Sequence, residues 1–181
     1  DEGGGGEKQG GGAVGGHGWG RVAEAEVASI AERAWPGGCV YASRMRPLPV
    51  RLPPGCDLRQ SLESLVRDQF RNGAFVLCGI GSLIDPRLRL AGESEEARYT
   101  GPFEILTLSG TVTLQGAHLH MSIASSEGDV RGGHVVYGNV VRTTAELLLV
   151  QAPEWELLRE RDAATGFLEL LARRQQVEDK P

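Results

Sequence analysis

Polar and apolar side chains alternate along the stretch from residue 117 to residue 123. A period of two is typical of a β-strand that buries one face. The polar set and the apolar set would lie on opposite faces: His118, His120 and Ser122 against Leu119, Met121 and Ile123. Turn-forming residues fill positions 125–129, so we predict a hairpin whose second strand covers residues 130–136.

This predicted hairpin carries a third histidine. If the turn is centred near Glu127, His134 lies across from His120. The pair Gly132-Gly133 favours a β-bulge, which would re-aim His134 by one residue, so the register stays open. We expect three imidazole rings to converge on one point.

A helix is predicted directly after Asp57. Apolar residues recur there at steps of three and four, at Leu58, Leu62, Leu65, Val66 and Phe70. Asp57 is suited to cap the helix, Gln60 stands at the capping-box position, and Asn72-Gly73 would end it.

The other apolar runs predict the rest of a sheet. Residues 39–52 read as extended, with prolines that restrict them to an edge. Further strands are expected at 74–80, 87–91, 103–108 and 111–114, the last two joined at Ser109-Gly110. Short strands at 140–141 and 147–150 would flank a kink at 142–146, and residues 154–161 fit either a helix or a strand.

Composition limits the folded part of the chain. At 181 residues and 40% hydrophobic, the chain can support one buried core, but eleven of its first twenty residues are glycine. We predict a disordered tail over 1–20, which contains His17, a helical extension over 21–38, a domain over 39–172 and a frayed end over 173–181.

Charge and cysteine content exclude several functions. A net charge of −5 with two lysines argues against autonomous DNA binding, since only Arg44, Arg46 and Arg51 cluster. Three cysteines without CxxC spacing, Cys39, Cys56 and Cys78, argue against a disulfide framework. No apolar stretch resembles a signal peptide or a membrane span, so we expect a soluble intracellular protein, cytoplasmic with a nuclear place left open.

Three neutral imidazoles without a thiolate suit a borderline divalent cation, zinc above all, and leave a fourth position for water or substrate. His118, His120 and His134 are therefore candidate metal ligands. The alternative is that they are surface or hydrogen-bonded strand histidines without a metal.

Several motifs in order resemble the plants-and-prokaryotes-conserved (PPC) domain over about residues 39–170. They include 51–58 (RLPPGCDL), 79–83 (GIGSL), 101–110 (GPFEILTLSG), 116–122 (GAHLHMS), 132–135 (GGHV), 143–146 (TTAE) and 165–167 (TGF). The resemblance implies a compact α+β domain, an antiparallel sheet with a few helices that assembles as a homotrimer. It also favours strands at 154–161 and 167–171 around a turn at 162–166.

The resemblance also bears on function. The fold is similar to that of acetolactate decarboxylase, in which three histidines hold zinc, and bacterial and archaeal members with this pattern look like metal binders. Plant members carry AT-hooks instead, and this chain has none. Their partner-binding segment matches residues 101–106 here, except that Pro102 replaces an arginine.

We therefore expect a trimeric domain that binds zinc or another divalent metal through three histidines and acts on or senses a small molecule. Glu104 is a candidate general acid or base, with a structural glutamate as the alternative. Arg46 and Arg51 are candidates for binding a substrate carboxylate. Enzymatic activity stays open, a metal-dependent lyase or hydrolase being one form of it. The other hypotheses are a DNA-associated regulatory or oligomerisation domain and a purely structural trimer.

Overall fold

The alternating stretch and its return strand form the predicted hairpin. The computed structural model describes residues 45–175. In it β6 (Gly116–Ala124) pairs antiparallel with β7 (Val130–Val135), and His120 lies opposite His134. Ser125 donates its backbone N–H to the carbonyl of Asp129 and closes the turn.

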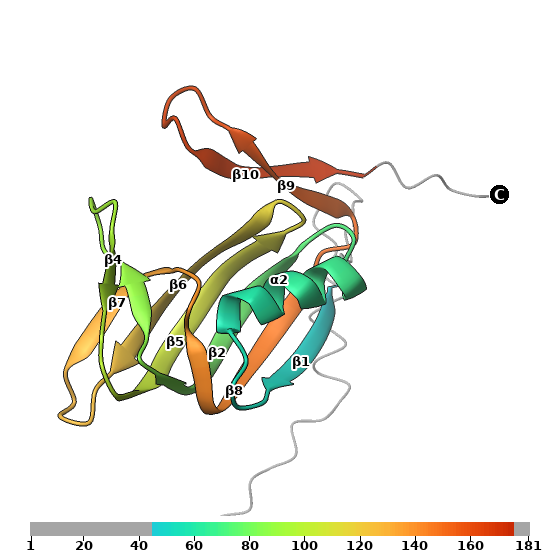
Figure 1. Ribbon diagram of the computed structural model, residues 1–181. Helices are drawn as coiled ribbons and strands as arrows, with labels where there is room; N and C mark the ends of the chain where they lie inside the picture. Colours follow the sequence, from blue (N-terminus) through green and yellow to red (C-terminus); the bar gives the residue numbers. More distant parts are fainter. Residues whose placement is uncertain (1–44, 176–181) are drawn as a thin grey trace, which may run out of the picture. The chain divides into compact units, whose positions relative to one another are not determined.

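The hairpin belongs to an antiparallel sheet of eight strands (Figure 1), in the order β1-β8-β2-β5-β6-β7-β3-β4. The other six strands are β1 (Arg46–Leu52), β2 (Ala74–Ile84), β3 (Arg87–Arg89), β4 (Glu96–Arg98), β5 (Pro102–Thr113) and β8 (Val140–Gln151). A separate two-stranded sheet pairs β9 (Trp155–Arg161) with β10 (Leu168–Arg174), as the family resemblance implied.

The predicted helix is α2 (Leu58–Gln69), and its cap is the expected one. The Asp57 carboxylate accepts hydrogen bonds from the backbone N–H of Gln60, at 2.8 Å, and from that of Gly138, at 2.5 Å. Asp57 therefore ties the start of the helix to the connection between β7 and β8. Helix α2 lies across one face of the sheet (Figure 1).

The core lies between α2 and this face of the sheet. Leu58, Leu62 and Val66 of the helix are fully buried, and each such side chain contributes roughly 1.5–3 kcal/mol through burial. The apolar set of β6 is buried with them, as the alternation predicted: Leu119, Met121 and Ile123. The histidines consequently lie on the face that α2 does not cover.

Several predicted elements were wrong in length or number. The two short strands expected around Ser109-Gly110 are one strand, β5. Strand β8 is also continuous, although its pairing with β2 shifts register between Ala145 and Val141, within the stretch where a kink was expected. Strand β4 was not predicted, and β10 continues to Arg174. The described residues contain one α-helix, so the domain is largely β rather than the expected α+β fold with a few helices.

A glycine explains why β5 does not end where the turn-like pair predicted. Gly110 has φ +145°, and a Cβ there would lie 2.1 Å from the carbonyl oxygen of His118. Only glycine lets β5 pass β6 this closely, so the residue read as a turn is instead a point of close strand contact.

Some predictions lie outside the described residues. These are the tail over 1–20, the helix over 21–38, the extended stretch over 39–44, and residues 176–181 of the end. Within residues 45–175 Cys56 and Cys78 are free thiols, and no helix has the length and apolar character needed to cross a bilayer.

Gly110 and Gly55 provide a matched pair of substitutions. Gly55 has φ +83°, and a Cβ added there would meet no atom within 4 Å, so Gly55→Ala should cost only the roughly 1–2 kcal/mol of a left-handed backbone. Gly110→Ala adds a backbone clash beside His118 and should destabilise the protein by at least about 2 kcal/mol more. Urea denaturation followed by circular dichroism measures both; equal losses would show that the strand contact does not matter.

Candidate metal centre

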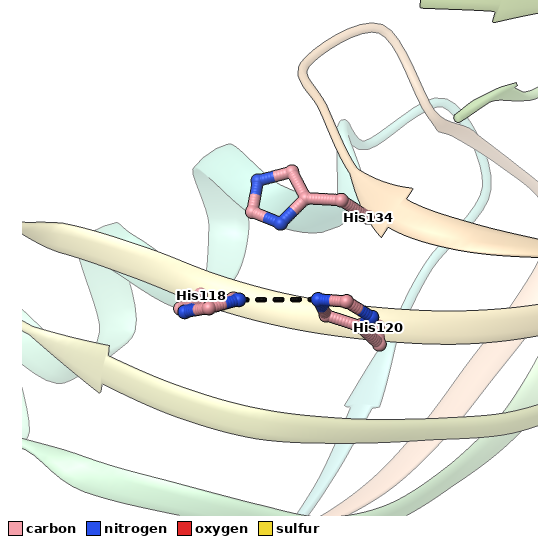
Figure 2. A group of neighbouring side chains, drawn as sticks. All are labelled: His118, His120 and His134. Carbon is pink, nitrogen blue, oxygen red and sulfur yellow. Dashed lines mark hydrogen bonds between the residues drawn. The ribbon is translucent and has the colours of Figure 1, made fainter. Parts of the chain in front are cut away.

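Three histidine side chains meet on the uncovered face of the sheet (Figure 2). His118 and His120 share that face of β6, and His134 projects from β7 beside them. The ring centroids are 5.1 Å apart for His118 with His120 or His134 and 5.4 Å apart for His120 with His134. One nitrogen from each ring lies within 4.8 Å of the other two.

The glycine pair before His134 does not form the bulge considered from the sequence. The ladder runs without a register shift from His120 opposite His134 to Ala124 opposite Val130. Gly133 instead allows β3 to approach, because a Cβ there would lie 2.8 Å from the carbonyl oxygen of Arg89. The result is a cross-strand row of His120, His134 and Arg89 on one face.

Arg59 of α2 contacts the backbone of both strands that carry the histidines. The ladder between β6 and β7 ends at the His120–His134 pair, and the Arg59 guanidinium occupies the opening. It donates to the carbonyls of Ala117 and Val135, at 2.9 Å each, and its Nη1 lies 3.5 Å from His134 Nε2. Arg59 thus fixes the spacing of the two strands where the histidines begin.

A carboxylate neutralises Arg59. Glu63 accepts from Arg59 Nε at 3.0 Å and from the Tyr137 hydroxyl at 2.7 Å, and the Arg59 guanidinium stacks 4.6 Å from the centre of the Tyr137 ring. Burial by itself would raise the pKa of Glu63, but the hydrogen bonds from Tyr137 and Arg59 outweigh it and the pKa is lowered. Glu63 is therefore an anion at neutral pH.

A second arginine approaches from the β9–β10 hairpin. Arg159 Nη1 lies 3.2 Å from His118 Nδ1, and Arg159 Nη2 donates to the Thr111 hydroxyl. Arginine only donates, so His118 Nδ1 accepts and the neutral ring carries its proton on Nε2. His118 Nε2 then donates to His120 Nε2, 3.1 Å away.

Burial keeps two of the rings neutral. It lowers the pKa of His134 to about 4, with the neighbouring His118 and Arg89 acting in the same direction. The pKa of His118 is lowered too, by burial first and by Arg159 next. Neutral imidazole is the form that ligates metals, so the site needs little proton release to bind one.

Two of the three donor nitrogens have the spacing of ligands that share one zinc ion. Nitrogens that share a tetrahedral zinc lie about 3.3 Å apart, since each Zn–N distance is about 2.0–2.1 Å, and the 3.1 Å between the Nε2 atoms of His118 and His120 is close to this. His134 turns Nδ1 toward that pair (Figure 2), and within residues 45–175 this buried atom has no hydrogen-bond partner. In the tautomer with the ring proton on Nε2, Nδ1 has a lone pair that a metal ion would bind and so satisfy.

Open clefts surround the trio. The largest, of about 920 Å³, extends from His118 and His134 to the tip of the β9–β10 hairpin. Two smaller ones, of about 310 and 320 Å³, adjoin the trio, the first beside Arg89 and the second beside Arg159. A small molecule can therefore reach a metal held by these rings.

Comparison with known proteins agrees with the motifs. The model of the Plants and Prokaryotes Conserved (PCC) domain matches residues 40–153. The chain belongs to this family. A hypothetical protein from Salmonella enterica has the same fold as this PCC-domain protein, with a TM-score of 0.71, 35% identity, and coverage of 75% of this chain and 98% of that one.

Other relatives of the PCC-domain protein extend the comparison. A metal-containing protein from Archaeoglobus fulgidus shares the fold, with a TM-score of 0.61, 22% identity and coverage of 70% and 93%. The bifunctional protein GlmU of Synechococcus sp. strain JA-3-3Ab is 40% identical over 149 residues, 78% of this chain. The chain spans only 24% of the length of that protein and 19% of a second cyanobacterial GlmU.

Other residues singled out in the sequence lie away from the trio. Glu104 is exposed on β5 and pairs with Ala124, four residues along β6 from His120. Its catalytic role stays a prediction, since the carboxylate is not next to the histidines of its own chain. Arg46 and Arg51 lie on β1, with β8, β2 and β5 between them and β6, so within one chain they are not placed to bind a substrate beside the trio.

Sequence reasoning missed the arginines that surround the PCC-domain histidines. Arg59 and Glu63 show an i,i+4 pairing that is visible in the sequence, but nothing there says that they reach β6 and β7. Arg89 and Arg159 come into place through strand pairing and the fold of the hairpin, for which single-sequence patterns give no signal.

The depressed pKa of His134 predicts acid sensitivity. Between the ordinary value of 6.5 and about 4, the unfolded chain binds a proton that the folded ring does not. The stability contributed by neutral His134 is thus fully present above pH 6.5, is lost as the pH falls toward 4, and changes no further below that value. As the pH is lowered from 7.5 to 4.5, the urea midpoint of the metal-free native protein should fall more steeply than that of metal-free His134→Gln. Parallel falls in the two proteins would show that His134 is not the source of the acid sensitivity.

Proposed function

We propose that this domain binds one divalent transition-metal ion per chain, best matched by zinc, through His118 Nε2, His120 Nε2 and His134 Nδ1. The observation that carries the proposal is the buried, unpartnered Nδ1 of His134, turned toward two Nε2 atoms 3.1 Å apart. A protein of the same fold from Archaeoglobus fulgidus is described as metal-containing, which is consistent with this reading.

Three protein ligands and an accessible cleft favour a reactive or sensing site over a structural one. Structural zinc sites take four protein ligands, whereas a site with three leaves a position for a small molecule. Bound zinc would supply Lewis acidity there. The chain's own contribution is to lower the pKa of His118 and His134 through burial, which keeps these two rings neutral, and to fix the spacing of β6 and β7 through Arg59.

We also propose that the domain works as a homotrimer. The central strands β2 and β5 expose large apolar side chains on the face that α2 leaves open: Leu77, Ile80 and Leu106, exposed by 54%, 57% and 46%. Uncovered apolar area of this kind is favourably buried by association. Clefts that open beside the histidines would then lie close to a neighbouring copy.

Metal content tests the first proposal. Protein purified without a histidine tag should contain about one zinc per chain by elemental analysis, and calorimetric titration of metal-free protein should give the same stoichiometry. His120→Gln removes an exposed ligand and should weaken zinc binding by more than about 100-fold, beyond the range for loss of an outer-shell partner.

Ser122→Ala is the matched control, since Ser122 lies two residues along the same face of β6 and offers no ring nitrogen. It should retain the affinity of the native chain. Stoichiometric zinc that survives in His120→Gln, or the absence of any zinc binding by the native chain, would overturn the metal proposal.

Solution mass tests the assembly. Light scattering of the full chain should give three times 19.4 kDa, and Ile80→Glu should reduce this to the mass of one chain by placing a charge in the buried interface. Leu114→Glu, on a side chain exposed by 51% in the turn after β5, is the control and should leave the trimer intact. A monomeric native chain, or an Ile80→Glu trimer, would refute the proposed interface.

A further inference from the structure

Three arginines adjoin the histidine trio without an ion-paired carboxylate. Arg89 follows His134 in the cross-strand row, Arg159 reaches His118 from β9, and Arg161 lines the large cleft. Among residues 45–175 no carboxylate oxygen forms an ion pair with any of the three, whereas Arg59 has Glu63.

Two carboxylates line the same clefts. Glu93 borders the large cleft, and Glu169 of β10 borders both the large cleft and the small one beside Arg159, where its carboxylate accepts from the Thr165 hydroxyl at 3.0 Å. Two carboxylates cannot balance three guanidinium groups. The trio therefore lies in a region of excess positive charge, which a divalent metal would increase.

One N–H group of Arg159 lacks an acceptor even in this arrangement. Its Nε–H is buried and has no hydrogen-bond partner among residues 45–175. If His118 binds a metal through Nε2, the ring proton moves to Nδ1, which can then no longer accept from Arg159 Nη1. Two N–H groups of a partly buried guanidinium would be left for an acceptor that the described part of the chain does not provide.

The large cleft, which Arg89 and Arg161 line, has an apolar wall. Phe167 and Leu168, at the tip of the β9–β10 hairpin, line it together with Arg161 and the histidines, and they are exposed by 73% and 55%. Polar recognition at one end and an apolar wall at the other match a ligand with an anionic group on an apolar body.

We infer that the site binds a small organic acid, whose carboxylate is held by Arg159 and Arg89 beside the histidine trio and whose apolar part rests on Phe167 and Leu168. This names the class of ligand that the proposed metal site would take. It depends on the metal proposal in one respect: metal binding would free Arg159 Nη1 from its hydrogen bond to His118. Arg159 and the hairpin tip lie beyond residues 40–153, the stretch that the family model matches.

Phenylacetate and its neutral analogue phenylacetamide are the probes. Calorimetric titration of the zinc-loaded full chain should show 1:1 binding of the acid, at least about tenfold tighter than that of the amide, as expected for a charge-assisted hydrogen bond. Binding of the acid should weaken when zinc is removed with a chelator.

Arg159→Gln and Arg89→Gln, each loaded to one zinc per chain, should each weaken phenylacetate binding by about tenfold. Arg98→Gln is the control, because Arg98 is exposed on β4 and paired with Glu96. Thermal denaturation checks that the variants fold; if Arg159→Gln is destabilised, Arg89→Gln alone provides the comparison.

Equal affinity for acid and amide, no binding of either, or equal losses in Arg89→Gln and Arg98→Gln would overturn the inference. The metal proposal fails separately: a chain that binds no zinc but still prefers the acid through Arg89 and Arg159 would retain the organic-acid site and lose the metal.

Discussion

The pairing of β6 with β7 is the constraint on which the rest of the structure depends. Because His120 lies opposite His134 and His118 is two residues away on the same face, one register brings three imidazoles together. A shift by one residue would turn His134 toward the core and place an apolar side chain on the open face. Gly110 and Gly133 fix the neighbouring pairings, of β5 with β6 and of β7 with β3, since each lies where the backbone of the adjacent strand leaves no room for a side chain.

The charged groups around the trio form two sets, one on the α2 side of the sheet and one on the open side. On the α2 side the charge of Arg59 is neutralised by Glu63, which also accepts a hydrogen bond from Tyr137. The role of Arg59 is therefore structural: it holds β6 and β7 together. On the open side no carboxylate of the described residues 45–175 forms an ion pair with Arg89, Arg159 or Arg161. Burial and neighbouring cations both favour neutral imidazole, the state in which a ring can donate its lone pair to a metal.

Local signals in the sequence were enough for the hairpin and for the helix. The alternation from residue 117 to 123 and the cap at Asp57 are each encoded within a few residues, and both predictions are confirmed. The strand boundary predicted at Ser109-Gly110 was wrong, because a glycine required for close strand contact has the same sequence signal as one required for a turn. Pairings between strands far apart in the chain place the arginines near the histidines and Glu104 away from them. No local pattern in the sequence reveals these pairings.

Anomalous diffraction from crystals of the zinc-loaded protein would locate the metal ion itself. We expect one zinc per chain, bound by Nε2 of His118, Nε2 of His120 and Nδ1 of His134, at about 2.0–2.1 Å from each nitrogen. Zinc bound elsewhere, or held by His118 and His120 while His134 rotates Nδ1 away from it, would refute the three-histidine site.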